Sequence, residues 1–340
     1  MTLSVGIVGL GLMGRTHLSA WQQVEGARVA AVCDMDPARL PDSTRPPAHP
    51  DAQPSGWEHT ASVFDDYDTM LREASLQAVD LCVPTDLHAE SARRALFAGL
   101  HVFCEKPVTL RHRDAAELAA LARDRGLIVM VGHCLRFWPE YRMLAEMLTS
   151  GRLGRVERIS LQRLGTWPTW SAGDWLSDVS RSGLAAMDLH VHDADVVLWW
   201  LGRPRAVTSS GVSEDCGGVS YIQTRYDYGP DGPEVTAEGG WVHDADPFRM
   251  AVHIETESAV VEYHSIANPT LTIRHRDGRV ERPRVPQANA YVEELRHFTR
   301  SILGEGAVEH CSIDQAVQAV RLVEGELQAI RSGRTFVLDW

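Results

Sequence analysis

The sequence contains no run of about 18 apolar residues, which is the length that a helix needs to cross a bilayer. Positive charge is also scarce, because 33 basic residues stand against 46 acidic ones, for a formal net charge of −13. Nucleic-acid backbones and anionic lipid surfaces repel a chain with that balance. We therefore expect neither a membrane nor a nucleic acid among its main partners.

Closely spaced cysteine pairs of the kind found in redox motifs and zinc sites are missing as well. None of the six cysteines belongs to a CxxC pair, and no zinc-ribbon spacing occurs. Cys33, Cys82 and Cys104 stand in apolar runs, where we expect them to be buried as small hydrophobic side chains. The apolar start, residues 2–13, lacks the basic residues and the cleavage site of a signal peptide. Because this cysteine usage suits a reducing compartment, we predict a cytoplasmic protein.

The first part of the chain alternates between short apolar runs and helical patterns. Strands are expected at residues 3–8, 28–33, 79–84, 101–105 and 127–131, and helices at residues 13–24, 61–74, 87–98 and 114–125. This alternation is typical of an α/β fold with a doubly wound parallel sheet. Residues 41–55 contain five prolines and cannot form a helix, so we interpret them as a surface excursion.

The second part changes character after about residue 135. A strand is expected at 156–165, a helix at 185–201 and several strands between 206 and 273, which indicates an α+β domain with a large, mostly antiparallel open sheet. Ser312 and Gln315 form a capping box for a last helix that ends at Gly333. We predict domains at 1–135 and 136–340, and the last helix is the one element that we expect to pack back on the first domain.

A glycine-rich turn follows the first expected strand and opens the first helix. It reads Gly9-Leu10-Gly11-Leu12-Met13-Gly14 and matches the GxGxxG pattern. In such a turn the first glycine allows a tight bend, the second lets the backbone approach a pyrophosphate, and the third lets helix and strand pack closely. The amides of Leu12 and Met13 then face the phosphates at the helix N-terminus. The pattern predicts a dinucleotide site in a Rossmann domain.

An acidic residue lies at the expected distance after this turn. Asp34 ends the second expected strand, 20 residues after Gly14. A carboxylate there binds the ribose hydroxyls and repels a 2′-phosphate, so we predict NAD rather than NADP as the cofactor. Arg15 and Arg39 are the nearby features that favour NADP instead. We assign Arg39 to the cofactor site with Asp34.

Further motifs, in order along the chain, resemble those of the Gfo/Idh/MocA oxidoreductase family. They are Pro84-Thr85-Asp86-Leu87-His88, Glu105-Lys106-Pro107, and Gly183-Leu184-Ala185-Ala186-Met187-Asp188 followed by His192. The resemblance implies that Lys106 and His192 face the nicotinamide, that Pro84, Thr85 and His88 line its side, and that the outer face of the second sheet forms a homodimer or homotetramer. The sequence differs from the family's usual pattern at Arg181 and Ser182, where glycines are usual. This difference puts in doubt whether the family's substrate pocket carries over to this chain.

The residues themselves suit the oxidation of a secondary alcohol. Asp188 and His192 are spaced i, i+4 on a predicted helix, where the carboxylate orients the imidazole for proton transfer. The ammonium of Lys106 stabilises the developing alkoxide and shares in the proton relay. Glu105 holds Lys106 or contacts the cofactor. A plain helix-surface ion pair and a solvated strand-end lysine are the alternative interpretations of these residues.

Several other residues have two interpretations each. Arg136 binds cofactor or substrate, or forms an interdomain salt bridge. Trp175 stacks on a sugar, or packs within its loop. The acids and histidines around residue 190 lack the spacing of a metal site, so we predict no metal.

Three functions fit these features. The first is an NAD-dependent dehydrogenase that oxidises a secondary hydroxyl of a sugar, polyol or cyclitol. The second is a glycoside-cleaving enzyme that uses NAD transiently, through oxidation at C3 followed by elimination. The third is a nicotinamide-binding regulator without turnover.

Overall fold

The computed structural model describes residues 2–40, 61–242 and 248–340. The chain divides into two compact units. Unit 1 comprises Met1–Thr109, Arg113–Cys134 and Ala288–Asp314, and unit 2 comprises Leu110–His112, Leu135–Gln287 and Gln315–Trp340. The expected proline-rich excursion at residues 41–55 lies outside the described residues. Among the helices of the described residues, none is both long and apolar enough to span a membrane.

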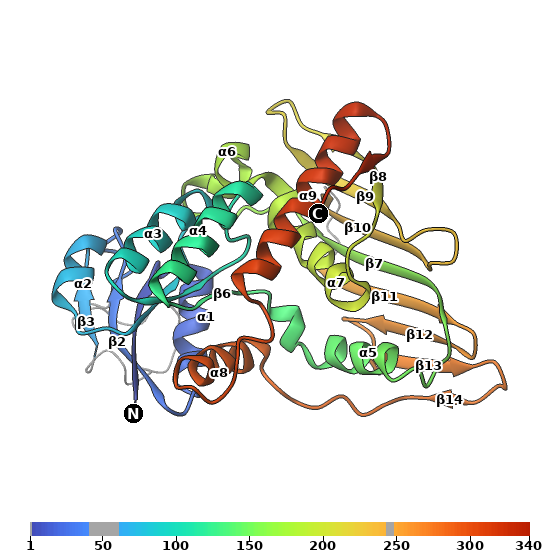
Figure 1. Cartoon of the computed structure of the whole chain (residues 1–340), viewed down its shortest axis with the longest axis horizontal. Coiled ribbons are helices and arrows are strands. Elements are labelled where there is room, and N and C mark those ends of the chain that lie inside the picture. Colours follow the sequence, from blue (N-terminus) through green and yellow to red (C-terminus); the bar gives the residue numbers. More distant parts are fainter. Residues whose placement is uncertain (1, 41–60, 243–247) are drawn as a thin grey trace. The chain divides into compact units, whose positions relative to one another are not determined.

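Unit 1 is built on a parallel sheet, as the sequence predicts, but the sheet has six strands rather than the five expected (Figure 1). Its strands are β1 (Leu3–Val8), β2 (Ala27–Cys33), β3 (Ser62–Phe64), β4 (Ala78–Leu81), β5 (His101–Cys104) and β6 (Val129–Val131). The order across the sheet is β3-β2-β1-β4-β5-β6, so successive strands are added on one side of β1 up to β3 and on its other side from β4 onward. Parallel sheets bind ligands at the carboxyl edge where the strand order reverses in this way.

The helices of unit 1 are α1 (Leu12–Trp21), α2 (Tyr67–Glu73), α3 (Thr85–Phe97), α4 (His112–Arg125) and α8 (Ala290–Ile302). The expected helix at 61–74 is wrong in its first part, because residues 62–64 form the edge strand β3 beside β2. The helix itself starts only at Tyr67, where the Asp66 side chain accepts a hydrogen bond from the Thr69 amide.

Helix α8 belongs to unit 1, although β6 ends at Val131 and α8 begins only at Ala290. The Asn289 side chain caps it by accepting a hydrogen bond from the Tyr291 amide. Leu295 and Phe298 are fully buried, and the Phe298 ring meets that of Phe103 edge to face at 5.6 Å. The two-domain prediction assigns this segment to the second domain, whereas its apolar face completes the core of the first.

Unit 2 contains a nine-stranded sheet in the order β14-β13-β12-β11-β7-β10-β9-β8-β15. The strands are β7 (Val156–Thr166), β8 (Ala206–Ser213), β9 (Val219–Asp227), β10 (Glu234–Val242), β11 (Arg249–Thr256), β12 (Ala259–His264), β13 (Leu271–His275), β14 (Val280–Glu281) and β15 (Phe336–Val337). Only the β7–β10 pair is parallel among these described pairings. The sheet is therefore mostly antiparallel, as expected.

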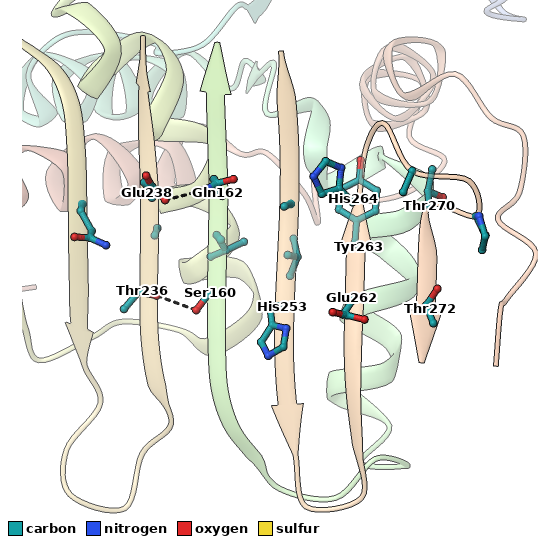
Figure 2. A pocket seen from close by; sticks show the side chains of 17 residues that line it. Ser160, Gln162, Thr236, Glu238, His253, Glu262, Tyr263, His264, Thr270 and Thr272 are labelled. Carbon is teal, nitrogen blue, oxygen red and sulfur yellow. Dashed lines mark hydrogen bonds between the residues drawn. The ribbon is translucent and has the colours of Figure 1, made fainter. Parts of the chain in front are cut away.

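The helices of unit 2 are α5 (Pro139–Thr149), α6 (Val179–Ser182), α7 (Val191–Leu201) and, from Gln315 onward, α9 (Ile313–Ser332). Successive residues of β7 point to opposite faces of the sheet. Ile159, Leu161 and Arg163 are buried on one face, whereas Ser160 and Gln162 on the other face are half-exposed. The second set faces a polar hollow of about 520 Å³ on the sheet (Figure 2).

Candidate active site

The glycine-rich turn after β1 has the shape that a pyrophosphate needs. Gly9 has φ +89°, and a Cβ there would lie 2.6 Å from the carbonyl oxygen of Cys82. A Cβ on Gly14 would lie 1.8 Å from the carbonyl oxygen of Gly9, so α1 approaches β1 as only glycine permits. A Cβ on Gly11 would meet only Arg39 Nη1, at 3.9 Å, so there is room for a ligand against the backbone. The turn fits a dinucleotide.

Asp34 is placed beside this turn by the end of β2. Its Oδ2 accepts a hydrogen bond from the Leu10 amide at 2.7 Å, and its Oδ1 accepts one from Asp36 at 2.9 Å. Each carboxylate oxygen has a second lone pair, which remains for a ribose hydroxyl. Arg39 Nη1 lies 3.7 Å from Asp34 Oδ2, so the two residues assigned to the ribose end are neighbours.

The loops after β4 and β5 are joined through His88. Pro84 precedes α3, and Thr85 and His88 are buried in its first turn. The His88 ring places Nδ1 2.8 Å from the carbonyl oxygen of Pro107 and Nε2 2.8 Å from that of Val83. Burial lowers the pKa of this imidazole. His88 therefore braces the loop that carries Lys106, and its contact with the cofactor stays a prediction.

Lys106 is the only lysine in the sequence, although the chain has 33 basic residues in total. It follows β5 at the carboxyl edge of the sheet, and its side chain is partly exposed. The peptide bond to Pro107 is cis. The Lys106 amide donates to Glu105 Oε2 at 3.1 Å, so the buried Glu105 holds the Lys106 backbone, one of the two roles expected for it.

Behind Glu105 lies a buried polar cluster that the sequence analysis missed. His17 of α1 is fully buried, with Nδ1 3.0 Å from Asp80 Oδ2 and Nε2 3.1 Å from Glu105 Oε1. The Trp21 indole also donates to Asp80, at 2.8 Å. Glu294 of α8 is fully buried, with its Oε1 4.0 Å from His17 Nε2. The signal in the sequence was Asp80, a charged residue in the middle of an otherwise apolar strand.

The charges of this cluster support one another. Burial by itself lowers the pKa of His17, but Asp80 and Cys82 raise it well above its ordinary value. Burial by itself raises the pKa of Glu105, but the facing His17 and the neighbouring Lys106 lower it overall. Burial raises the pKa of Glu294 well above its usual range, which favours the neutral acid. The cluster thus holds an imidazolium between two carboxylates.

In unit 2, the segment with Asp188 and His192 begins as a π-helical turn, Ala186–His190, and continues as α7. Turns of this kind occur often at functional sites. Asp188 and His192 are both partly exposed, whereas His190, Asp193 and Asp195 are buried. His190 Nε2 lies 2.9 Å from Glu326 Oε2 in the core of unit 2.

The two buried aspartates of α7 each pair with an arginine. Arg163 Nε donates to Asp193 at 2.8 Å, and Arg136 donates through Nε and Nη2 to Asp195 at 2.8 Å. Arg136 is only 3% exposed. Because Arg136 and Asp195 both belong to unit 2, their ion pair lies within that unit rather than between domains. The ligand sets within metal-binding reach among the described residues are centred on His17 and do not include the residues around 190.

Trp175 packs on a small hydrophobic cluster formed by Leu176, Leu184, Ala185 and Trp241. The neighbouring Trp167 meets Trp241 edge to face at 5.3 Å, and its indole donates to the Ser177 hydroxyl. These contacts are the loop packing that the sequence analysis gave as one interpretation. Sugar stacking by the partly exposed Trp175 ring stays a prediction.

Curated relatives match the chain over different lengths. The inositol 2-dehydrogenase of Rhizobium meliloti is 30% identical over 62% of this chain and 58% of that protein. The 2,7-anhydro-N-acetylneuraminate hydratase of Mediterraneibacter gnavus is 28% identical over 62% and 52%. The D-xylose 1-dehydrogenase (NADP(+)) 2 of Haloferax volcanii is 24% identical over 98% and 99%. The chain therefore spans little more than half the length of the first two.

Solved structures share the whole fold. The WlbA dehydrogenase of Bordetella pertussis, solved with NADH and UDP-GlcNAcA, has a TM-score of 0.82 and 18% identity over 100% of both chains. Residues 3–133 match the family model described as an oxidoreductase family with an NAD-binding Rossmann fold, and residues 141–260 match that family's C-terminal domain. The chain belongs to the Gfo/Idh/MocA oxidoreductase family.

Proposed function

We propose that the protein is an NAD-dependent dehydrogenase that oxidises a secondary hydroxyl of a sugar, polyol or cyclitol to a ketone. The observation that carries the proposal is Lys106. It is the only lysine of the chain, it follows β5 in the unit that holds the dinucleotide turn, and a buried carboxylate holds its backbone. The curated relatives named as inositol and xylose dehydrogenases support this substrate class.

The bound nicotinamide supplies the hydride acceptor. In the proposed mechanism the Lys106 ammonium donates a hydrogen bond to the substrate oxygen and stabilises the negative charge that develops on it. His192 takes part in removing the hydroxyl proton, and Asp188 orients the imidazole. Arg136 and Trp175 are retained as proposed contacts of the pocket, Arg136 toward cofactor or substrate and Trp175 toward the sugar.

We also propose NAD over NADP. The carboxylate of Asp34 is 8% exposed and ends β2 next to the turn, where it repels a 2′-phosphate. Arg39 offsets part of this charge, and one full-length relative is named as an NADP(+) enzyme. None of the six cysteines, all of which the structure describes, is in a disulfide, in agreement with the proposed cytoplasmic location.

A paired screen tests the activity. Purified protein is mixed with NAD or NADP and a panel of inositols, aldoses, anhydrosugars and aryl glycosides, and nicotinamide absorbance and product mass are followed together. We expect NADH formation with the matching keto product. The matched control is the Lys106→Ala variant, which should bind NAD and form product about 100- to 10,000-fold more slowly. Turnover of every panel member at the same rate with and without Lys106 would contradict the proposal.

A second function is favoured by the hydratase among the relatives. In that case the cofactor would be oxidised and reduced within one cycle, and a glycosidic or anhydro bond would be cleaved by elimination. The same screen separates the two, because cleavage of an aryl glycoside or anhydrosugar without net NADH is its expected result.

A further inference from the structure

The starting observation is that both ring nitrogens of His17 face carboxylates. Nδ1 lies 3.0 and 3.1 Å from the two Asp80 oxygens, and Nε2 lies 3.1 Å from Glu105 Oε1. A neutral imidazole has one N–H and one lone pair, so one of these contacts would oppose a lone pair to a carboxylate. The doubly protonated ring presents an N–H toward Asp80 and another toward Glu105.

The groups that face His17 come from every element packed around it. Asp80 and Cys82 come from the β4 segment, Glu105 follows β5, and Tyr291 and Glu294 come from α8. Burial raises the pKa of Glu294 well above its ordinary value, which favours the neutral acid over a third negative charge. One cation then lies between two anions in a fully buried space, which a protein retains only when the geometry is satisfied.

The cluster reaches Lys106 through the two oxygens of Glu105. Oε1 faces His17, and Oε2 accepts the hydrogen bond of the Lys106 amide. Gly132, just after β6, makes room for this carboxylate, because a Cβ there would lie 3.0 Å from Glu105 Oε1. The position of the Lys106 backbone is thereby tied to a ring on α1.

We propose that His17, fixed by Asp80, is a positioning residue that holds Glu105 and through it aims Lys106 at the reacting hydroxyl. The chemical consequence rests on the proposed dehydrogenase function, but the structural consequence does not. His17 itself touches neither substrate nor cofactor in this proposal. Its contribution is to keep the Lys106 backbone in one place, since a displacement of about 1 Å at a reacting group costs about 100-fold in rate.

The single lysine makes the test specific. Reductive methylation with ¹³C-formaldehyde labels only the Lys106 side chain and the N-terminal amine, so the NMR spectrum of the full chain has two labelled positions. We compare the wild type with His17→Gln and with Gly132→Ala, which moves the Glu105 carboxylate by a few tenths of an ångström and leaves His17 in place. The matched control is Tyr67→Phe, which removes one buried hydrogen bond, to the Ser91 carbonyl, elsewhere in unit 1.

We expect the Lys106 methyl signal to move in His17→Gln and, by less, in Gly132→Ala, and to stay in place in Tyr67→Phe. Where a substrate is turned over, kcat should fall about 10- to 100-fold in His17→Gln while the KM for NAD is kept. An unchanged Lys106 signal in both variants overturns the positioning role. If His17→Gln does not fold, Gly132→Ala decides alone.

The two proposals fail separately. If the wild type oxidises no member of the panel, the dehydrogenase proposal falls, while the NMR comparison still decides the link between His17 and Lys106. If the wild type is an active dehydrogenase and the Lys106 methyl signal is unchanged in both variants, only the positioning role of His17 is refuted. ¹⁵N NMR of the His17 ring gives a further check, because the proposal requires both nitrogens to be protonated at neutral pH.

Discussion

At the scale of single residues, Lys106 and Asp34 carry the chemistry that we assign. All the other residues among the 33 lysines and arginines are arginines, so Lys106 is chemically distinct among them. Arginine stays protonated in proteins, whereas a lysine side chain gives up and regains a proton. The Asp34 carboxylate in turn accepts hydrogen bonds from the amides of Leu10 and Asp36, which fix its position beside the glycine turn.

Replacing Lys106 separates its charge from its proton transfer. We expect Lys106→Ala to lower kcat about 100- to 10,000-fold with the Kd for NAD unchanged. Lys106→Arg keeps the charge and should recover part of the loss. Steady-state kinetics with a substrate from the screen and calorimetric titration with NAD measure the two quantities. Full activity of the alanine variant would remove Lys106 from the mechanism.

Replacing Asp34 tests the choice of cofactor. Asp34→Ser removes the negative charge and keeps a small polar acceptor beside the Leu10 amide. We expect the ratio of NAD to NADP affinity to fall, because the repulsion of the 2′-phosphate is lost and Arg39 remains. Titration of both cofactors by fluorescence gives the ratio. An unchanged ratio would show that Asp34 does not select the cofactor.

At the scale of elements, α8 and α1 enclose the His17 cluster inside unit 1. The apolar face of α8 brings Phe298 against Phe103, and its Glu294 completes the polar pocket around the His17 ring. The pKa values of His17 and Glu294 are both raised in the folded chain. A group with a raised pKa stabilises the fold below its unfolded pKa, and this stabilisation is lost as the pH rises through the folded pKa.

This sign leads to a prediction for the two helices. We expect α1 and α8 to become less protected from amide hydrogen exchange as the pH rises above neutral, after correction for the intrinsic exchange rate. Glu294→Gln replaces the neutral acid by a neutral amide, so it should reduce that pH dependence and leave only the part due to His17. Exchange followed by mass spectrometry reports on both helices. A steeper pH dependence in the variant would mean that Glu294 is ionised in the folded chain.

At the scale of the whole molecule, the open face of the nine-stranded sheet is a broad polar surface. Gln162 donates to Glu238 across neighbouring strands, and Thr236 donates to Ser160 in the same way (Figure 2). His253 and Glu262 lie on the adjacent strands β11 and β12. We propose that a second copy of the chain covers this face, in line with the homodimer or homotetramer that the family resemblance implies.

An arginine in the middle of this face tests the assembly. Ala251 of β11 lines the hollow, and Ala251→Arg places a long charged side chain where a second sheet would lie. We expect the wild type to have a multiple of the 37.7 kDa chain mass by light scattering, and the variant to shift toward a single chain. Phe97→Arg, an exposed site on α3, is the control. A wild type that is monomeric at all concentrations would refute the assembly.

Features set by local backbone chemistry were predictable from the sequence. The parallel strands, the glycine turn and the place of Lys106 follow from short apolar runs and from glycines that no other residue replaces, as the 1.8 Å approach at Gly14 illustrates. The antiparallel character of the second sheet followed from its runs of strands and turns in the same way. The motifs of the candidate site could therefore be identified from the sequence alone.

Pairings between distant residues were decided only by the tertiary structure. His17, Asp80, Glu105 and Glu294 lie far apart in the chain, and nothing local shows that one ring joins them. In the same way the sequence left Arg136 open between a ligand and a salt bridge, and the fold places it on Asp195. The physical reason is that a buried charge is stable only beside its partner, and the packing of the core selects that partner.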